Sequence, residues 1–279
     1  MTFANILVHL DGSDHAQVRI AIASELSKRF DAHLIGLAAS GSLQIPGDAQ
    51  VPFAGAFMGS VTDSMRDNAN AAAAAFRTFS DRQQLRPAES RVELAAVETA
   101  LLEHGRYSDL VVVGQPTRDT SDFRALNMSG LVYLLMGVAR PVLVVPYAGQ
   151  SKPPGARVLV AWNDSPQSMR AVTDALPLLK KAEQVDLLML NPRKSRWIDT
   201  EEPGAEIALY LARHSVKVSV HAESVDIDAG NAILSRAADL DSDLIVAGAY
   251  GHSYLREMIL GGVTQRLLDT MTVPVLLSH

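Results

Sequence analysis

The chain contains an internal repeat, and this repeat constrains its fold more than any other feature. "NILVHLDGSDHAQVRIAIASEL" (residues 5–26) runs parallel to "RVLVAWNDSPQSMRAVTDALPLL" (157–179), because each consists of four apolar residues, a polar turn and a helical pattern. Later in each copy, "SDLVVVGQP" (108–116) matches "SDLIVAGAY" (242–250). Self-similarity over such a distance indicates a tandem duplication, in which one structural unit is used twice.

The segment between the two copies marks a domain boundary. "YAGQSKPPGAR" (147–157) contains Gly, Ser and two prolines, which interrupt both helices and sheet ladders. We therefore expect a first domain over residues 1–148 and a second over residues 155–279. Two domains also agree with the prior of about 150 residues per domain.

The pattern within each copy predicts the fold class. Short β-branched runs alternate with helical stretches such as "AIASELSKRF" (21–30) and "NAILSRAADL" (231–240). Strands that are apolar on both faces and separated by helices indicate a parallel sheet covered on each side. We predict an α/β protein with two doubly wound, Rossmann-like domains. In the first copy, residues 40–59 are rich in Gly and Pro and predict a loop, which a long helical pattern (62–85) follows.

Composition and charge exclude several classes of protein. The net charge of −6 and the pI of about 5.7 argue against a nucleic-acid or anionic-membrane partner. The absence of cysteine excludes disulfides and thiol catalysis, and the start of the chain has no signal-peptide pattern, so we expect a cytoplasmic protein. The apolar stretch 130–149 is divided by Arg140 and Pro141, which predicts a helix end and a strand instead of a membrane span.

The stretch "GAYGHSYLREMILGG" (248–262) raises the question of a ligand. It follows a predicted strand, as does the turn after the first strand of the copy, and ligands of open α/β sheets bind at such ends. Free backbone N–H groups at a helix start can hold an anion, and glycines let the backbone approach it closely. The P-loop lysine is absent. These residues alone leave two interpretations open, a phosphate site or glycines that only turn the chain.

The glycine spacing resembles that of a known family. Gly248-x-x-Gly251, nine residues, then Gly261-Gly262-Val263-Thr264 is similar to the motif of nucleotide-binding universal stress proteins, which carry G-x-x-G, nine residues, then G-Ser/Thr. The resemblance covers nearly the whole chain as two tandem copies. It implies a five-stranded parallel sheet per copy, with ATP, ADP or AMP bound across the first turn and the glycine loop. Mg²⁺ or Mn²⁺ would arrive with the nucleotide, since no dedicated metal cage is present in the sequence.

The resemblance also assigns residues to this site in the second copy. They are Asn163, Asp164 and Ser165 facing the adenosine, Leu190 and Asn191 bordering the adenine, Gly248, Gly251 and His252 lining the phosphates, and Gly261, Gly262, Val263 and Thr264 closing the other side. Two positions depart from the family pattern. Gly262 stands where Ser or Thr is usual, and Asn163 replaces an Asp, so we expect weaker ATP binding without its loss.

The first copy retains only part of the motif. Asp11, Gly12, Ser13 and Gly114 are present, but no second glycine follows Gly114 at the required distance. We expect this copy to contribute weakly to nucleotide binding, to be structural, or to bind something else.

Three functions remain, in order. The first is a nucleotide-binding stress regulator with slow or absent chemistry and no catalytic residues, because no general base can be identified. The second is a stress scaffold that binds no nucleotide and uses both copies for pairing. The third is an ATPase or kinase, which the sequence supports least, since no Lys, Asp pair or arginine finger can be assigned to phosphoryl transfer.

Two terminal strands predict how the copies assemble. "RPVLVVP" (140–146) and "VPVLLSH" (273–279) are apolar and lie at predicted sheet edges, which favours pairing. Because the family that the chain resembles uses such edges for dimers, we expect the two copies to form a pseudo-dimer within one chain. A homodimer and an unidentified protein partner are further expectations.

Overall fold

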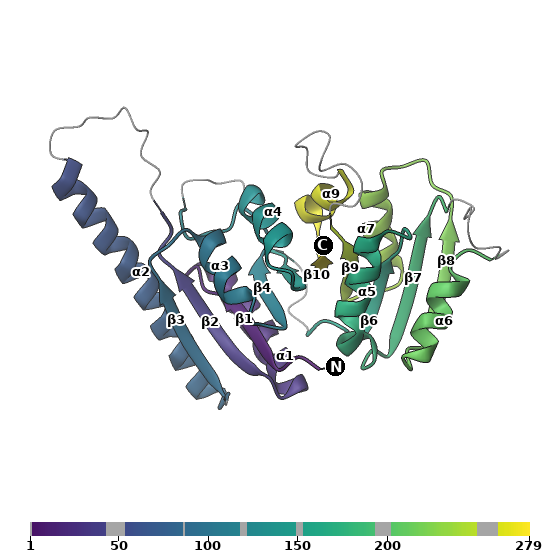
Figure 1. Ribbon diagram of the computed structural model, residues 1–279, viewed down its shortest axis with the longest axis horizontal. Helices are drawn as coiled ribbons and strands as arrows, with labels where there is room; N and C mark the ends of the chain where they lie inside the picture. Colours follow the sequence, from purple (N-terminus) through teal and green to yellow (C-terminus); the bar gives the residue numbers. More distant parts are fainter. Residues whose placement is uncertain are drawn as a thin grey trace. The chain divides into compact units, whose positions relative to one another are not determined.

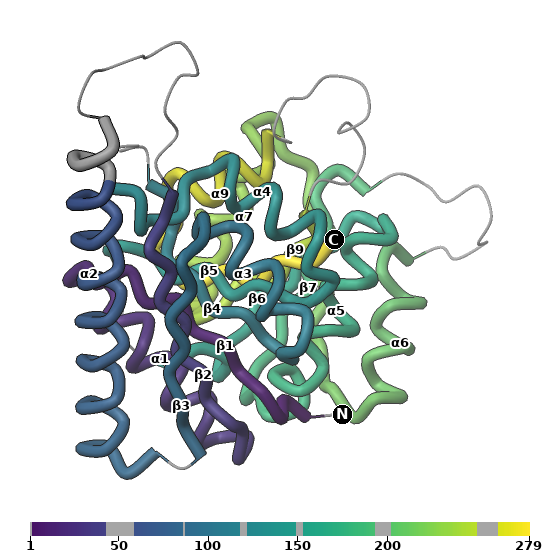
Figure 2. Tube along the Cα trace, turned by 60° about the vertical axis from the view of Figure 1, so that its left-hand side comes forward, coloured from purple at the N-terminus to yellow at the C-terminus, as the bar shows by residue number. Residues whose placement is uncertain are grey.

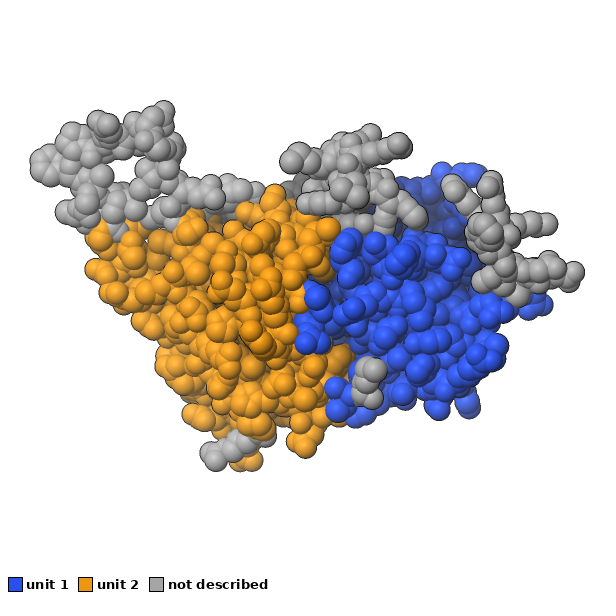
Figure 3. All heavy atoms as spheres, viewed as in Figure 1, with its two compact units in different colours: residues 1–2, 139–279 blue, residues 3–138 orange. Residues whose placement is uncertain are grey.

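The computed structural model describes residues 2–42, 54–85, 87–117, 122–148, 153–192, 202–249 and 262–279. Its contacts divide the chain into two compact units, the N-terminal unit (3–138) and the C-terminal unit (139–279 with residues 1–2), which are orange and blue in Figure 3. The predicted domain limits, 1–148 and 155–279, follow the sequence repeat, whereas the contacts group residues 139–148 with the C-terminal unit.

The N-terminal unit is a parallel sheet with the strand order β3-β2-β1-β4. The side chains of Ile6, Leu7 and Val8 on the central strand β1 are all fully buried, so both faces of the sheet are covered. The elements are β1 (Asn5–His9), α1 (Asp14–Phe30), β2 (His33–Ala39), α2 (Ala54–Arg82), β3 (Ala88–Glu93), α3 (Val97–Gly105), β4 (Leu110–Gly114) and α4 (Met128–Gly137).

The long helix α2 lies alongside β2 and β3 (Figures 1 and 2). It begins at Ala54, so the predicted loop over 40–59 is wrong for its last six residues. The segment "AGAFMG" (54–59) contains Ala and Met, which favour helices, and extending a helix requires no new nucleus. Local propensity therefore prevails over the nearby glycines. Residues 43–53 lie outside the described part of the chain.

The C-terminal unit has the strand order β5-β10-β9-β6-β7-β8. Five of these strands are parallel, and β5 is antiparallel to β10, with Leu143 opposite Leu276. The predicted pairing of the two terminal apolar strands is thus confirmed. The elements are β5 (Val142–Val145), β6 (Arg157–Ala161), α5 (Pro166–Leu179), β7 (Gln184–Leu190), α6 (Ala205–Arg213), β8 (Ser219–Glu223), α7 (Ala229–Asp239), β9 (Leu244–Gly248), α9 (Gly262–Thr270) and β10 (Val275–Ser278).

The duplication extends to individual hydrogen bonds. The Asp109 carboxylate accepts the N–H groups of Ala4 and Asn5 at 2.8 and 2.9 Å, which fixes the start of β1. The corresponding Asp243 accepts N–H groups of residues 155–157 at 2.6 to 3.2 Å, at the start of β6. The predicted doubly wound α/β fold, used twice, is confirmed. None of the helices within the described ranges has the length and apolar character needed to cross a bilayer.

Candidate functional site

The turn after β6 is fixed by its own side chains. Asn163 Oδ1 accepts hydrogen bonds from the backbone N–H and the hydroxyl of Ser165, at 3.3 and 2.7 Å. Ser165 is the N-cap of α5, and its Oγ accepts from the N–H of Ser168 at 3.1 Å in a capping box. Asp164 between them has a left-handed backbone, with φ of 58°. The turn therefore presents Asn163 at the carboxyl end of the sheet while Ser165 starts the helix.

Gly248, at the end of β9, has a packing role. A Cβ atom at this position would lie 2.5 Å from the backbone nitrogen of Ser168 and 2.6 Å from the carbonyl carbon of Gln167. Because both atoms belong to the start of α5, only glycine lets this helix pack against the strand end. This requirement for glycine holds whether or not a ligand binds.

A cavity of about 290 Å³ lies at the carboxyl ends of β6, β7 and β9, and α7 and α9 complete its wall. Its volume is near the lower end of small-molecule sites. Segments that are far apart in sequence meet here, which is the arrangement expected at the strand ends of an open α/β sheet. The lining residues are Ala161, Trp162, Asn163, Leu188, Leu190, Ala229, Ile233, Ala247, Gly248, Gly262, Val263, Thr264 and Leu267.

About half of the predicted ligand-facing residues line this cavity. They are Asn163, Leu190, Gly248, Gly262, Val263 and Thr264. Asp164 is exposed, and the Ser165 hydroxyl is engaged by the turn and the helix cap. The Asn191 amide is bonded to the backbone of Val225, whose C=O and N–H it engages at 3.1 and 2.9 Å. Gly251, His252 and Gly261 lie outside the described residues.

Sequence reasoning missed the apolar part of the wall. Ala229 and Ile233 come from α7, and Ala161 and Ala247 from the ends of two strands. No motif marks these residues. The small side chains at the strand ends are the one signal that was available, because they leave space where larger residues would close the sheet end.

A wider hollow of about 670 Å³ lies along α6 and is more open to solvent. Its lining is mainly apolar, with Lys217 as its charged residue, and it comes from α6 and the segment 215–218 that follows it. Convergent polar groups from separate elements, which orient a ligand, are confined to the smaller cavity of the two. We therefore place the candidate site in the 290 Å³ cavity.

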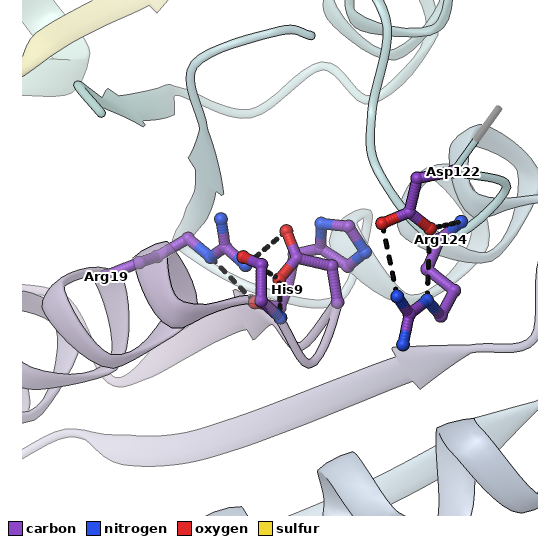
Figure 4. Close-up of polar contacts among 6 residues, drawn as sticks. His9, Arg19, Asp122 and Arg124 are labelled. Carbon is purple, nitrogen blue, oxygen red and sulfur yellow. Dashed lines mark hydrogen bonds and ion pairs between the residues drawn. The ribbon is translucent and has the colours of Figure 1, made fainter. Parts of the chain in front are cut away.

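The N-terminal unit has the same turn but different surroundings. Asp11 Oδ1 accepts from the N–H and the hydroxyl of Ser13 at 3.0 and 2.7 Å, as Asn163 does from Ser165. Its second oxygen, Oδ2, pairs with Arg19 at 2.9 Å (Figure 4). Arg19 is 1% exposed, and its Nε donates to the carbonyl oxygen of His9 at 2.8 Å. A Cβ atom on Gly114 would clash with Arg19 Nη1, so the guanidinium lies directly against this glycine.

These buried charges shift the titration of both neighbours. Burial, with a smaller contribution from the Arg19 charge, lowers the pKa of His9 from 6.5 to about 4, so this histidine is neutral. Burial alone would raise the pKa of Asp11, but Arg19 and the bonds from Ser13 hold it well below its usual range. The N-terminal unit thus contains an ionised Asp–Arg pair where the C-terminal unit has an amide.

Comparisons with known proteins agree with this architecture. The model of the universal stress protein family matches residues 156–279. Through this match the chain belongs to the universal stress protein family. All residues that line the cavity fall within the matched range, whereas His9, Asp11 and Arg19 lie outside it. No curated protein matches the sequence of the chain.

Two solved structures share the fold over both units. A universal stress protein from Archaeoglobus fulgidus DSM 4304 has a TM-score of 0.71 and 17% identity, and the similarity covers 98% of this chain and 97% of that one. A candidate universal stress protein from Pseudomonas aeruginosa UCBPP-PA14 has a TM-score of 0.59 and 15% identity, with 99% and 93% covered. At these identities the likeness is one of fold, and it includes the tandem arrangement.

Proposed function

We propose that the C-terminal unit binds an adenine nucleotide in the 290 Å³ cavity, and that occupancy of this cavity regulates contacts with other proteins in a stress response. The observation that carries the proposal is convergence. Six residues chosen from the glycine motif and the strand turn line one cavity, although they come from separate segments of the chain. The resemblance to nucleotide-binding universal stress proteins supplies the class of ligand.

The chemistry of the wall supports a nucleoside in the cavity. The lining side chains are apolar apart from Asn163 and Thr264, and none carries a charge. Asn163 Oδ1 is engaged by Ser165, and no described residue accepts a hydrogen bond from its Nδ2, which leaves a donor for the ligand. An apolar slot with a few placed polar groups is the usual setting for a planar base and its sugar.

The phosphates would lie at the start of α9. Gly262, Val263 and Thr264 line the cavity and form the first turn of this helix. The first N–H groups of a helix lack partners within the helix, and its dipole favours an anion there. A divalent cation would come with the nucleotide, because no group of three His, Asp or Glu side chains gathers within the described ranges.

We propose binding without rapid chemistry. The described lining residues include no side chain that could act as a general acid or base near neutral pH. The alternative, a scaffold that binds no nucleotide, is favoured by one observation, the packing role of Gly248, which explains that glycine without a ligand.

Calorimetry with ATP, ADP and AMP in the presence of Mg²⁺ tests the proposal. Ala161→Leu should fill the cavity from the end of β6 and weaken binding by at least about tenfold, which corresponds to about 1.4 kcal/mol. The matched control is Ala182→Leu, a similarly half-buried position in the same unit but outside the cavity. We expect one nucleotide per chain for the wild type and the control. Absence of saturable binding below about 1 mM to the folded protein would leave the scaffold alternative.

A further inference from the structure

The N-terminal unit has the same strand ends as the cavity, but its own side chains occupy the corresponding positions. The repeat aligns His9 with Ala161, Asp11 with Asn163 and Arg19 with Ala171. His9 is 1% exposed and follows the same register on β1 that Ala161 follows on β6. An imidazole therefore stands where the C-terminal unit has only a methyl group.

A short segment covers the ends of β1 and β2. A Cβ atom on Gly41 would clash with the carbonyl oxygen of Phe123, and one on Gly12 would lie 3.4 Å from Arg124 Nη1. The segment is held by an ion pair between Asp122 and Arg124, at 3.0 and 3.2 Å. Its far end is fixed by the N–H of Thr117, which donates to the carbonyl of Leu126 at 3.0 Å. Figure 4 shows His9 between Arg19 on one side and the Asp122–Arg124 pair on the other.

One atom in this arrangement lacks a partner. His9 forms a hydrogen bond with the backbone of Arg124, yet its Nε2 is buried and no described group bonds to it. Buried polar atoms are almost always paired, and an exception requires an explanation. Because His9 is neutral and one ring nitrogen bonds to the backbone, the free nitrogen is suited to a ligand that offers an N–H or O–H donor.

We propose that the N-terminal unit contains a second, latent ligand site, which His9 and the segment 122–126 keep closed. The segment 122–126 covers the strand ends, and His9 fills the space beneath it. The remaining wall is apolar, as in the C-terminal unit, because Leu37, Ala39 and Val113 correspond to Leu188, Leu190 and Ala247. The matching ligand is a small planar molecule with a donor group, such as a nucleobase or nucleoside.

Thiol accessibility tests the closure without any ligand. The chain has no cysteine, so a single introduced thiol is the sole site of reaction with 5,5′-dithiobis(2-nitrobenzoate). Ala39→Cys and Leu190→Cys place thiols at equivalent ends of β2 and β7. We expect the Ala39→Cys variant to react at least about tenfold more slowly than the Leu190→Cys variant, since thiol reactivity follows exposure. Equal rates in the folded proteins would overturn the closure.

Opening variants test what closes the site. His9→Ala in the Ala39→Cys background should raise the reaction rate by about tenfold or more, whereas the control His33→Ala, at a half-buried position on β2, should leave it unchanged. Arg124→Ala removes the ion pair at the surface and provides a second opening variant if the first does not fold. An unchanged rate in every folded opening variant would show that these residues do not close the site.

The class of ligand has a separate test. The triple substitution His9→Ala, Asp11→Asn and Arg19→Ala gives the N-terminal turn the residues of the C-terminal turn. Calorimetry with AMP should then show one more nucleotide bound per chain than in the wild type. This arm rests on the proposed function of the cavity, whereas the thiol rates do not, so the two failures are distinguishable. An open site that gains no AMP would overturn the assignment of a nucleoside ligand.

Discussion

The turns after β1 and β6 have the same hydrogen bonds and yet differ in what lies behind them. In each, one side-chain oxygen at the strand end, of Asp11 or Asn163, receives two bonds from a serine two residues later. Behind the first turn lie His9 and Arg19, and behind the second lie two alanines at the equivalent positions. The comparison teaches that the local motif sets the backbone, while the size and charge of residues outside the motif decide whether a cavity forms.

The largest expected effect is on the buried ion pair. Arg19→Ala leaves the buried Asp11 carboxylate without its partner and should destabilise the N-terminal unit by about 3–5 kcal/mol. Hydrogen exchange of β1 amides measures the loss, and β6 amides provide the internal reference. The control Arg170→Ala breaks an exposed pair with Asp174 and should cost less than about 1 kcal/mol. If Asp11→Asn does not offset part of the Arg19→Ala loss, the pair is not the cause.

The second effect is a pH dependence specific to the N-terminal unit. The pKa of His9 is 6.5 when the chain is unfolded and about 4 in the folded unit, so the unfolded state binds more protons between these values. The free energy of unfolding should be constant above about pH 6.5 and fall by about 3 kcal/mol as the pH is lowered to 4. Urea titrations across this range measure it, and His9→Gln should flatten the profile. A wild-type profile parallel to that of His9→Gln would contradict a buried neutral His9.

The third prediction sharpens the comparison from the side of the cavity. Gly262 has open space around its Cβ position, so Gly262→Ser restores the hydroxyl of the family motif without a clash. The added hydrogen bond should tighten ATP binding by about fivefold, or roughly 1 kcal/mol. Calorimetry measures the change, with Gly59→Ser in α2, another glycine with open space, as control. Unaltered affinity would place the ligand away from the start of α9.

The smallest effect compares the two helix starts. Ser165 accepts a hydrogen bond from Ser168 in a capping box, whereas the Ser13 side chain makes no cap bond to α1. Ser165→Ala should therefore cost about 1 kcal/mol of stability, more than Ser13→Ala. Urea unfolding followed separately in each unit by hydrogen exchange gives the two values. A larger loss for Ser13→Ala would mean that its bond to Asp11 matters more than the cap.

The sequence predicted those features that repeat or carry a local signal. The duplication, the alternation of strands and helices and the place of Asn163 at a strand end follow from patterns within short segments. The start of α2 was missed, because Ala54 and its neighbours favour a helix more than the adjacent Gly and Pro suggest. The antiparallel direction of β5 against β10 has no sequence signal of its own, since an apolar strand pairs in either direction.

The content of the two strand ends could not be predicted from the motif. Arg19 was recognised in the repeat, but nothing local indicates that its guanidinium occupies the space beside Gly114. Ala229 and Ile233 join the cavity only because α7 packs over β7, which is a tertiary contact. Residues that act through bulk instead of chemistry carry no motif, and they distinguish the closed unit from the open one.

The pairing of β5 with β10 has a consequence for how the protein is made. Val144 pairs with Val275, so nearly half the chain separates the two strands. A ribosome adds about 5–20 residues per second, and β5 therefore waits on the order of ten seconds before its partner exists. During that time its apolar edge is unpaired in the nascent chain. Full-length synthesis, and not only folding of each unit, is what protects this strand from association with other chains.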